Sequence, residues 1–158
     1  MCPQGKVQPS NAILESGTPI TQEYEAGTVT HLAPGRLVIT ETNDYTCTVA
    51  TAAALTVLGV ADVPSDEKLS SMQANATVSG APTTTFTTGD QIRVLRGDIV
   101  VKLLLKSGED VDVGERIEAA ANGMCQAYTT ALADVGYSLE DTGGATTTCD
   151  WILVKLTI

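Results

Sequence analysis

The chain has 158 residues, a mass of 16.4 kDa and a formal net charge of −10, with 19 acidic and 9 basic side chains. This length fits one domain that can bury a core without a metal or a disulfide framework. The negative charge repels phosphate backbones, so nucleic acid is not an expected partner. The sequence has no long apolar run, so no membrane partner is expected, and without a signal-peptide pattern we expect synthesis in a cytoplasm.

The apolar residues favour strands over helices. Hydrophobic residues make up 43% of the chain but aromatic ones only 4%, so a core must be built from Val, Ala, Leu and Ile. Thr is frequent and occurs in runs at 83–85, 87–88 and 146–148. Val and Thr are branched at Cβ and suit a pleated strand better than a helix. The composition therefore predicts an all-β fold.

Residues 1–20 are rich in proline, at positions 3, 9 and 19. Prolines at this density disfavour both a helix and a central strand. We interpret residues 1–20 as an extended N-terminal arm, whose apolar Val7, Ile13 and Leu14 are candidate contacts with a neighbouring subunit. A frayed terminus is an equally good interpretation.

A single β-barrel domain is expected over residues 21–158, beginning with short segments of alternating polarity. Strands are predicted at 27–32, 36–40, 45–49 and 56–60. Pro34-Gly35 is typical of a turn, and residues 41–44 form a second, polar turn.

Residues 61–88 have a different character. They are rich in Ser, Thr, Ala, Gly and Pro, and contain few large apolar residues beyond Met72, Val78 and Phe86. A segment of this length without a regular pattern is usually functional, disordered or at a sheet edge. We interpret it as a polar surface insertion, and we take these three residues as further candidate interface positions.

The second half is more regular. Residues 99–105 are almost continuously apolar and predict a central strand, and Asn122-Gly123 predicts a tight hairpin because both residues tolerate positive φ. Further strands are predicted at 91–95, 131–139 and 150–158. Many short strands, spaced by roughly 8–12 residues and without a helical period, predict a small barrel or sandwich.

No motif with catalytic or metal-binding chemistry is present. The sequence lacks the elbow, phosphate-loop, zinc-protease and dinucleotide patterns. His31 is the only imidazole and falls in a predicted strand before a turn. The acidic group Glu109, Asp110 and Asp112 lacks the ligand spacing of a calcium loop and fits a solvated strand face. We therefore expect no enzyme, no catalytic residue, no metal and no cofactor.

Four cysteines lie at positions 2, 47, 125 and 149, without the CxxC spacing of a metal site. We expect them to be reduced packing residues or a terminal thiol. The alternative is one disulfide between Cys47 and Cys149, since both lie in predicted strands.

Glycine-marked segments of the chain resemble the capsid decoration (cement) proteins of tailed phages. Members typically show a GD-x-V-x-V strand, a G-(D/E)-x-(L/I) turn, an A-A-N-G-x-V hairpin and a terminal W-x-x-V-x-L strand. The similar segments here are GDQIRV at 89–94, GDIVVK at 97–102, VGERI at 113–117, AANGM at 120–124, WILVKL at 151–156 and PGRLV at 34–38. The resemblance covers residues 27–60 and 89–158. It departs from the family at Cys125 and in the long loop at 140–148.

The resemblance implies a compact, tulip-like β-barrel that is commonly a homotrimer. Proteins of this family bind the major capsid protein on the outer surface of the virion and reinforce the shell, after synthesis in the host cytoplasm. Arm exchange or strand addition would supply main-chain hydrogen bonds for such a contact. The alternative is a viral tail, fibre or cell-surface β module that recognises glycan, which would need exposed aromatic side chains.

Overall fold

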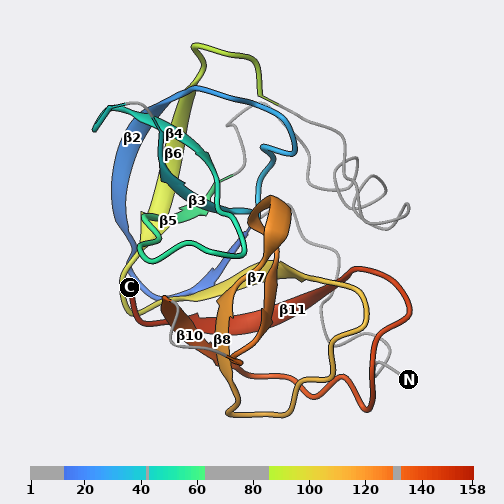
Figure 1. The fold of residues 1–158 in the computed structure, drawn as a ribbon. Coiled ribbons are helices and arrows are strands. Elements are labelled where there is room, and N and C mark those ends of the chain that lie inside the picture. Colours follow the sequence, from blue (N-terminus) through green and yellow to red (C-terminus); the bar gives the residue numbers. More distant parts are fainter. Residues whose placement is uncertain (1–12, 42, 63–85, 130–132) are drawn as a thin grey trace.

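The protein is all-β in the computed structural model, which describes residues 13–41, 43–62, 86–129 and 133–158. The described strands form two sheets, which lie one above the other in Figure 1. The all-β prediction is confirmed. The predicted small β-barrel is also confirmed, although the chain folds into two such barrels.

The first barrel is closed by five strands in the order β2-β4-β3-β5-β6. Their bounds are β2 (Ile20–Ala26), β3 (Leu37–Thr40), β4 (Thr46–Val49), β5 (Gly59–Ala61) and β6 (Gln91–Arg96). The longest pairing is antiparallel between β2 and β6, with Ile20 opposite Arg96. Apolar side chains that include Leu32, Phe86 and Ile92 fill the inside.

The second barrel contains β7 (Val100–Leu105), β8 (Arg116–Ala119), β9 (Cys125–Ala127), β10 (Asp134–Ser138) and β11 (Asp150–Leu156). The strand order is β7-β11-β10-β8-β9, and β9 returns to β7 through a bridge between Leu105 and Cys125. The remaining part of the β7 edge pairs with β1 (Leu14–Ser16). The prediction that residues 99–105 form a central strand is therefore confirmed.

The chain joins the fold earlier than predicted. Ile13 is fully buried in the larger of the two apolar cores, and its carbonyl accepts a hydrogen bond of 2.9 Å from Lys102 N. Strand β1 and the start of β2 also lie within residues 1–20. The last part of the predicted arm, from Ile13 on, is therefore strand and core, since a three-residue strand fits between Pro9 and Pro19. Gly17, with φ of +96°, turns the chain between the two strands. Residues 1–12 lie outside the described residues.

The strand predicted at 27–32 is also wrong. The strand is β2, in which Tyr24 and Ala26 point inward while Thr21, Glu23 and Glu25 are exposed. Residues 27–32 form a loop in which His31 has φ of +64° and Leu32 N bonds to Val29 O at 2.9 Å. Burial of Leu32 in the first barrel closes this loop onto the core.

The larger core continues from the inside of the second barrel into the contact between the barrels. It joins Val101, Ile117 and Val154 of the second barrel to Leu37, Val60 and Leu95 of the first. Trp151 packs against the turn at Gly35, where a Cβ atom would collide with the indole ring. Glycine is required there, both for this close approach and for its φ of +78°.

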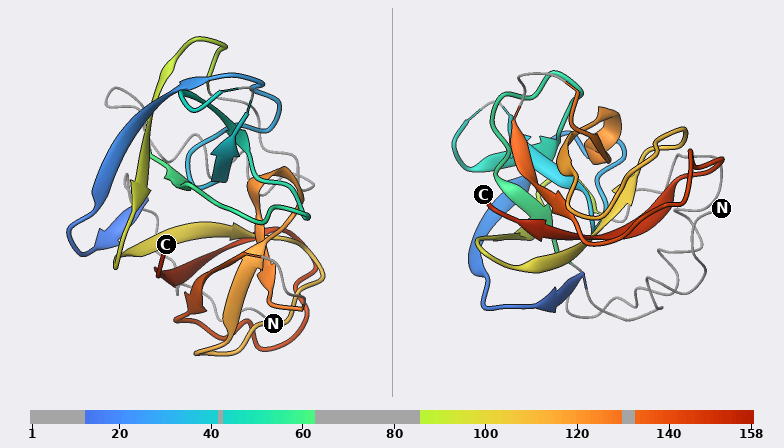
Figure 2. Two further views of the ribbon diagram at one scale, coloured as in Figure 1. Left: turned by 60° about the vertical axis from the view of Figure 1, so that its left-hand side comes forward. Right: turned by 90° about the horizontal axis from the view of Figure 1, so that it is seen from below.

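The turn between β8 and β9 crosses from the second barrel to the first (Figures 1 and 2). Asn122 and Gly123 both have positive φ, at 60° and 69°, so the predicted Asn-Gly hairpin is confirmed. Gly123 N donates to Ala50 O at 2.8 Å, and Arg36 Nη1 donates to Asn122 O at 2.8 Å. This insertion ties the two barrels together.

Replacement of Gly123 by Ala tests this tie. The new Cβ would lie 2.8 Å from Leu37 O and would sit on a left-handed backbone, so we expect a loss of about 2–4 kcal/mol in the free energy of unfolding, measured with urea. Gly108→Ala is the matched control, because Gly108 has φ of +89° but no atom within 4 Å of its Cβ position. It should lose only about 1 kcal/mol. Equal losses in the two variants would contradict the role of the contact.

Candidate interaction surfaces

The described part of the chain shows no cluster of potential metal ligands. Within it, no three side chains of His, Cys, Asp or Glu are grouped so as to hold a metal ion. His31 lies in the loop between β2 and β3 and is partly buried.

Among the described residues, no helix has the length and apolar character needed to span a membrane.

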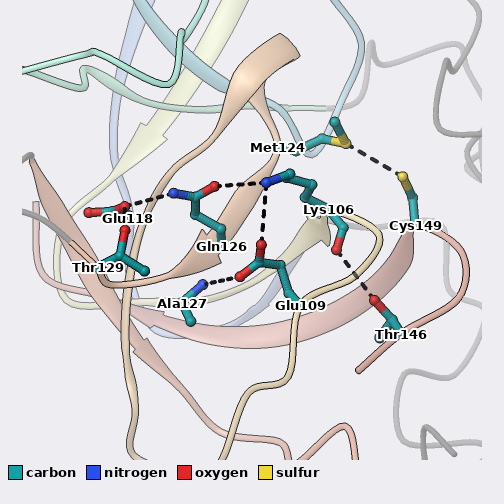
Figure 3. A network of polar contacts seen from close by, with 9 residues as sticks. All are labelled: Lys106, Glu109, Glu118, Met124, Gln126, Ala127, Thr129, Thr146 and Cys149. Atoms are coloured by element: carbon teal, nitrogen blue, oxygen red, sulfur yellow. Dashed lines mark hydrogen bonds and ion pairs between the residues drawn. The ribbon is translucent and has the colours of Figure 1, made fainter. Parts of the chain in front are cut away.

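A polar network stabilises one end of the second barrel (Figure 3). The Glu118 carboxylate is fully buried and accepts hydrogen bonds from Gln126 Nε2 at 2.7 Å and Thr129 Oγ1 at 3.0 Å. Lys106 Nζ lies 3.5 Å from Gln126 Oε1 and 3.4 Å from Glu109 Oε1. Because a buried carboxylate is tolerated only when its oxygens are hydrogen-bonded, this network is structural.

Two buried cations also serve the fold. Lys102 Nζ lies 2.7 Å from Glu15 Oε1 and so anchors β1 on β7. Arg36 is almost fully buried between the barrels, and desolvation lowers its pKa to about 10. A buried cation that donates to Asn122 O is costly to displace, which fixes the hairpin turn in place.

The cysteines of the described chain are free thiols in separate places. Cys47 lies in the core of the first barrel, whereas Cys125 and Cys149 lie in the larger core. The alternative of a Cys47–Cys149 disulfide is therefore wrong. Burial, aided by the charge of Glu41, raises the pKa of Cys47 to about 11, and burial raises the pKa of Cys125 well above its ordinary value.

These thiols should be unreactive in the native protein. In a Cys2→Ser variant we expect a chromogenic thiol reagent to detect no rapidly reacting thiol before denaturation and three after it, because all three are buried. The raised pKa of Cys47 means that the native state holds this proton more tightly than the unfolded state does. The free energy of unfolding should therefore fall as the pH rises from about 9 to about 11.

A Cys47→Ala variant should show a shallower fall over the same pH range, since it lacks the thiol. If the denatured Cys2→Ser variant gave only one reactive thiol, a disulfide would be present and this assignment would be contradicted.

The six predicted interface residues fall in different places. Ile13 and Phe86 are buried in the two cores, and Leu14 is partly buried on β1, so these side chains pack within their own chain. These apolar residues occur singly in polar segments, so no sequence pattern distinguished residues of the protein's own core from residues of an interface with another subunit. Val7, Met72 and Val78 lie outside the described residues, as does most of the predicted 61–88 insertion, of which only the ends are described.

An apolar patch on the second barrel was missed from the sequence. Val113 is 65% exposed, and Tyr137 and Leu139 are both exposed on the neighbouring segment. Gly114 N donates to Ser138 O at 2.8 Å, which brings the backbone next to Val113 close to the segment of Tyr137 and Leu139. We call Val113, Tyr137 and Leu139 the outer patch. Exposed apolar groups that lie together, unlike single ones, mark candidate contact surfaces.

A shallow hollow of about 420 Å³ lies at the seam of the two barrels, close to the chain end marked C in Figure 1. Ile20, which is 57% exposed, and Ile158 give it apolar walls, and Arg96 gives it a guanidinium group. Asp98 also lines the hollow, and its exposed carboxylate lies 2.8 Å from Lys155 Nζ.

Arg96 differs from the other exposed cations of the described chain, each of which lies near a carboxylate. Those pairs are Arg93 with Asp62, Lys106 with Glu109, Arg116 with Asp134 and Lys155 with Asp98. Within the described ranges Arg96 makes no ion pair. The hollow therefore combines apolar walls with a guanidinium group that has no carboxylate partner among the described residues, while the Asp98 carboxylate of its lining is paired with Lys155.

Comparison with known proteins gives a fold and no family. No family model and no curated protein matches the sequence. Among solved structures, the fold is similar to the crystal structure of the N base of the head fiber gp8.5 in bacteriophage phi29. The TM-score is 0.52 and the sequence identity is 12%, over 89% of this chain and 95% of that chain. At this identity the comparison establishes a shared fold.

Proposed function

We propose that the chain is a structural protein of a phage virion. The observation that carries the proposal is the shared fold with the N base of a phage head fiber, which extends over 89% of this chain. The glycine-marked resemblance to phage decoration proteins supports the same class independently, since it rests on local sequence rather than on topology.

The more specific proposal is a decoration subunit that binds the major capsid protein on the outer surface of the shell and stabilises it. A binding role suits a chain whose described buried polar groups, such as Glu118 and Lys102, are engaged in holding strands together. The outer patch is the surface that we propose for this contact, because apolar groups at the centre of an interface supply most of its affinity. Repetition over a lattice allows each single contact to be weak.

Glycan recognition is the second candidate, and Tyr45 is the observation that favours it. Its ring is 80% exposed and could stack on a sugar. Trp151, the strongest stacking residue of the chain, is buried against Gly35 and is not accessible to a ligand. A glycan array with no bound sugar would leave the capsid proposal ahead.

The capsid contact is tested by sedimentation of the protein with undecorated capsids of the parent particle. We expect the wild-type chain to cosediment and to raise the temperature at which the capsids lose their genome. The Val113→Asp/Leu139→Asp variant should bind at least tenfold more weakly, because it places two charges in a desolvated contact. Leu55→Asp is the control, since Leu55 is exposed outside the patch, and it should bind like wild type.

Circular dichroism should be the same for both variants, because the substituted side chains are exposed. Failure of the wild-type chain to bind capsids at any salt concentration would overturn the decoration proposal. Equal binding by the patch variant would remove the outer patch from it.

A further inference from the structure

Residues 43–45 on the first barrel present an aromatic ring and a carboxylate together. In the turn between β3 and β4, Asn43 Oδ1 accepts hydrogen bonds from Tyr45 N at 2.8 Å and Thr46 N at 3.0 Å. Glu25 N donates to Tyr45 O at 2.8 Å, which fixes the turn to β2. Tyr45 is 80% exposed, and the exposed Asp44 makes no ion pair within the described chain. We call residues 43–45 the Tyr45 knob.

The hollow is chemically complementary to this knob. Its Ile20 and Ile158 walls match the phenol ring, and the Arg96 guanidinium matches the Asp44 carboxylate. The Asp98 carboxylate, which also lines the hollow, is already paired with Lys155 at 2.8 Å. A volume of about 420 Å³ lies within the range of roughly 300–1,000 Å³ that is typical of ligand pockets, so one aromatic side chain fits. The Tyr45 knob and the hollow are both exposed. Neither the Asp44 carboxylate nor the Arg96 guanidinium has an ion-pair partner in the described parts of the chain.

The knob and the hollow cannot meet within one copy, because they lie at opposite ends of β2 (Figure 1). Ile20 begins the strand and pairs with Arg96, whereas Glu25 pairs with Thr46 beside the knob. A seven-residue strand spans about 20 Å. The closed first barrel holds both ends at this separation, so only the knob of another copy can reach the hollow.

We propose that the Tyr45 knob of one copy occupies the hollow of the next copy, with Asp44 paired to Arg96. Such a contact joins two different surfaces of the same chain and is heterologous, so repetition gives a ring if the rotation closes and a linear chain if it does not. The inference goes beyond the proposed function, because a contact between copies does not depend on what else the chain binds.

The first test is sedimentation velocity of the full chain over a range of concentrations. Wild type should associate, and Asp44→Arg or Arg96→Asp should each raise the concentration at which association occurs at least tenfold. The double variant Asp44→Arg/Arg96→Asp should restore much of the association, since it exchanges the two charges. Leu55→Ser, which alters an exposed residue outside the knob and the hollow, should behave like wild type.

The second test separates a heterologous contact from a two-fold symmetric one. Tyr45→Ser keeps an intact hollow, and Arg96→Asp keeps an intact Tyr45 knob, so a mixture of the two should form dimers that neither variant forms alone. A two-fold symmetric contact through either surface would give no such complementation.

Three results would overturn the proposal. The first is a wild-type chain that stays monomeric at every concentration, and the second is association that the charge reversals leave unchanged. The third is loss of capsid binding by Arg96→Asp with unchanged self-association, which would assign the hollow to a capsid partner. Because capsid binding is measured by cosedimentation and is attributed to the outer patch, either proposal can fail while the other stands.

Discussion

The insertion of the β8–β9 turn against the first barrel is the contact on which the remaining structure depends. It requires two consecutive residues with positive φ, and Asn122 and Gly123 supply them. It also requires donors and acceptors at the seam, which are Arg36 Nη1 and Ala50 O. Because Arg36 is removed from water there, movement of the Asn122 carbonyl would cost this buried cation its hydrogen bond of 2.8 Å. The two barrels are thereby fixed against one another, and so are the walls of the hollow at their seam.

In the described chain, the buried polar groups hold the fold together, so the groups that are free to contact another molecule are the exposed ones. The buried carboxylate of Glu118 and the buried ammonium of Lys102 hold strands of the second barrel, and the three described thiols are buried in the cores. What faces solvent is an apolar patch, a hollow with an unpaired guanidinium and a fixed aromatic turn. These features suit the binding role that we propose, because binding at several points on a repeating surface requires that those points keep their spacing. The shared fold with a phage head fiber base fits this interpretation.

Local features were predictable from the sequence, and long-range ones were not. The Asn122-Gly123 hairpin, the Pro34-Gly35 turn and the apolar strand at 99–105 have signals within a few residues, and all are present. Strand β2 was missed because Pro19 precedes it and because its outward side chains are Thr and Glu, which read as a surface segment. Closure into two barrels depends on pairs far apart in the chain, such as Ile20 with Arg96, which no local pattern encodes.

For the same reason Ile13 and Phe86 could not be recognised as core residues, since the strands that bury them come from distant segments. The exposure of Tyr45 and Val113 could not be predicted either. An alternating pattern of polar and apolar residues predicts which face of a strand a residue lies on, but not whether another part of the chain covers that face.

Our central proposal is that this chain is a virion structural protein that binds as one two-barrel unit. A cryo-electron microscopy reconstruction of the particle whose genome encodes the chain tests it most directly. The account predicts density on the outer surface of the shell into which both barrels fit together as a single body, with the relative orientation that the β8–β9 turn imposes. A map that shows no such density in particles that contain the intact shell, or that shows the two barrels in a different relative orientation, would contradict the account.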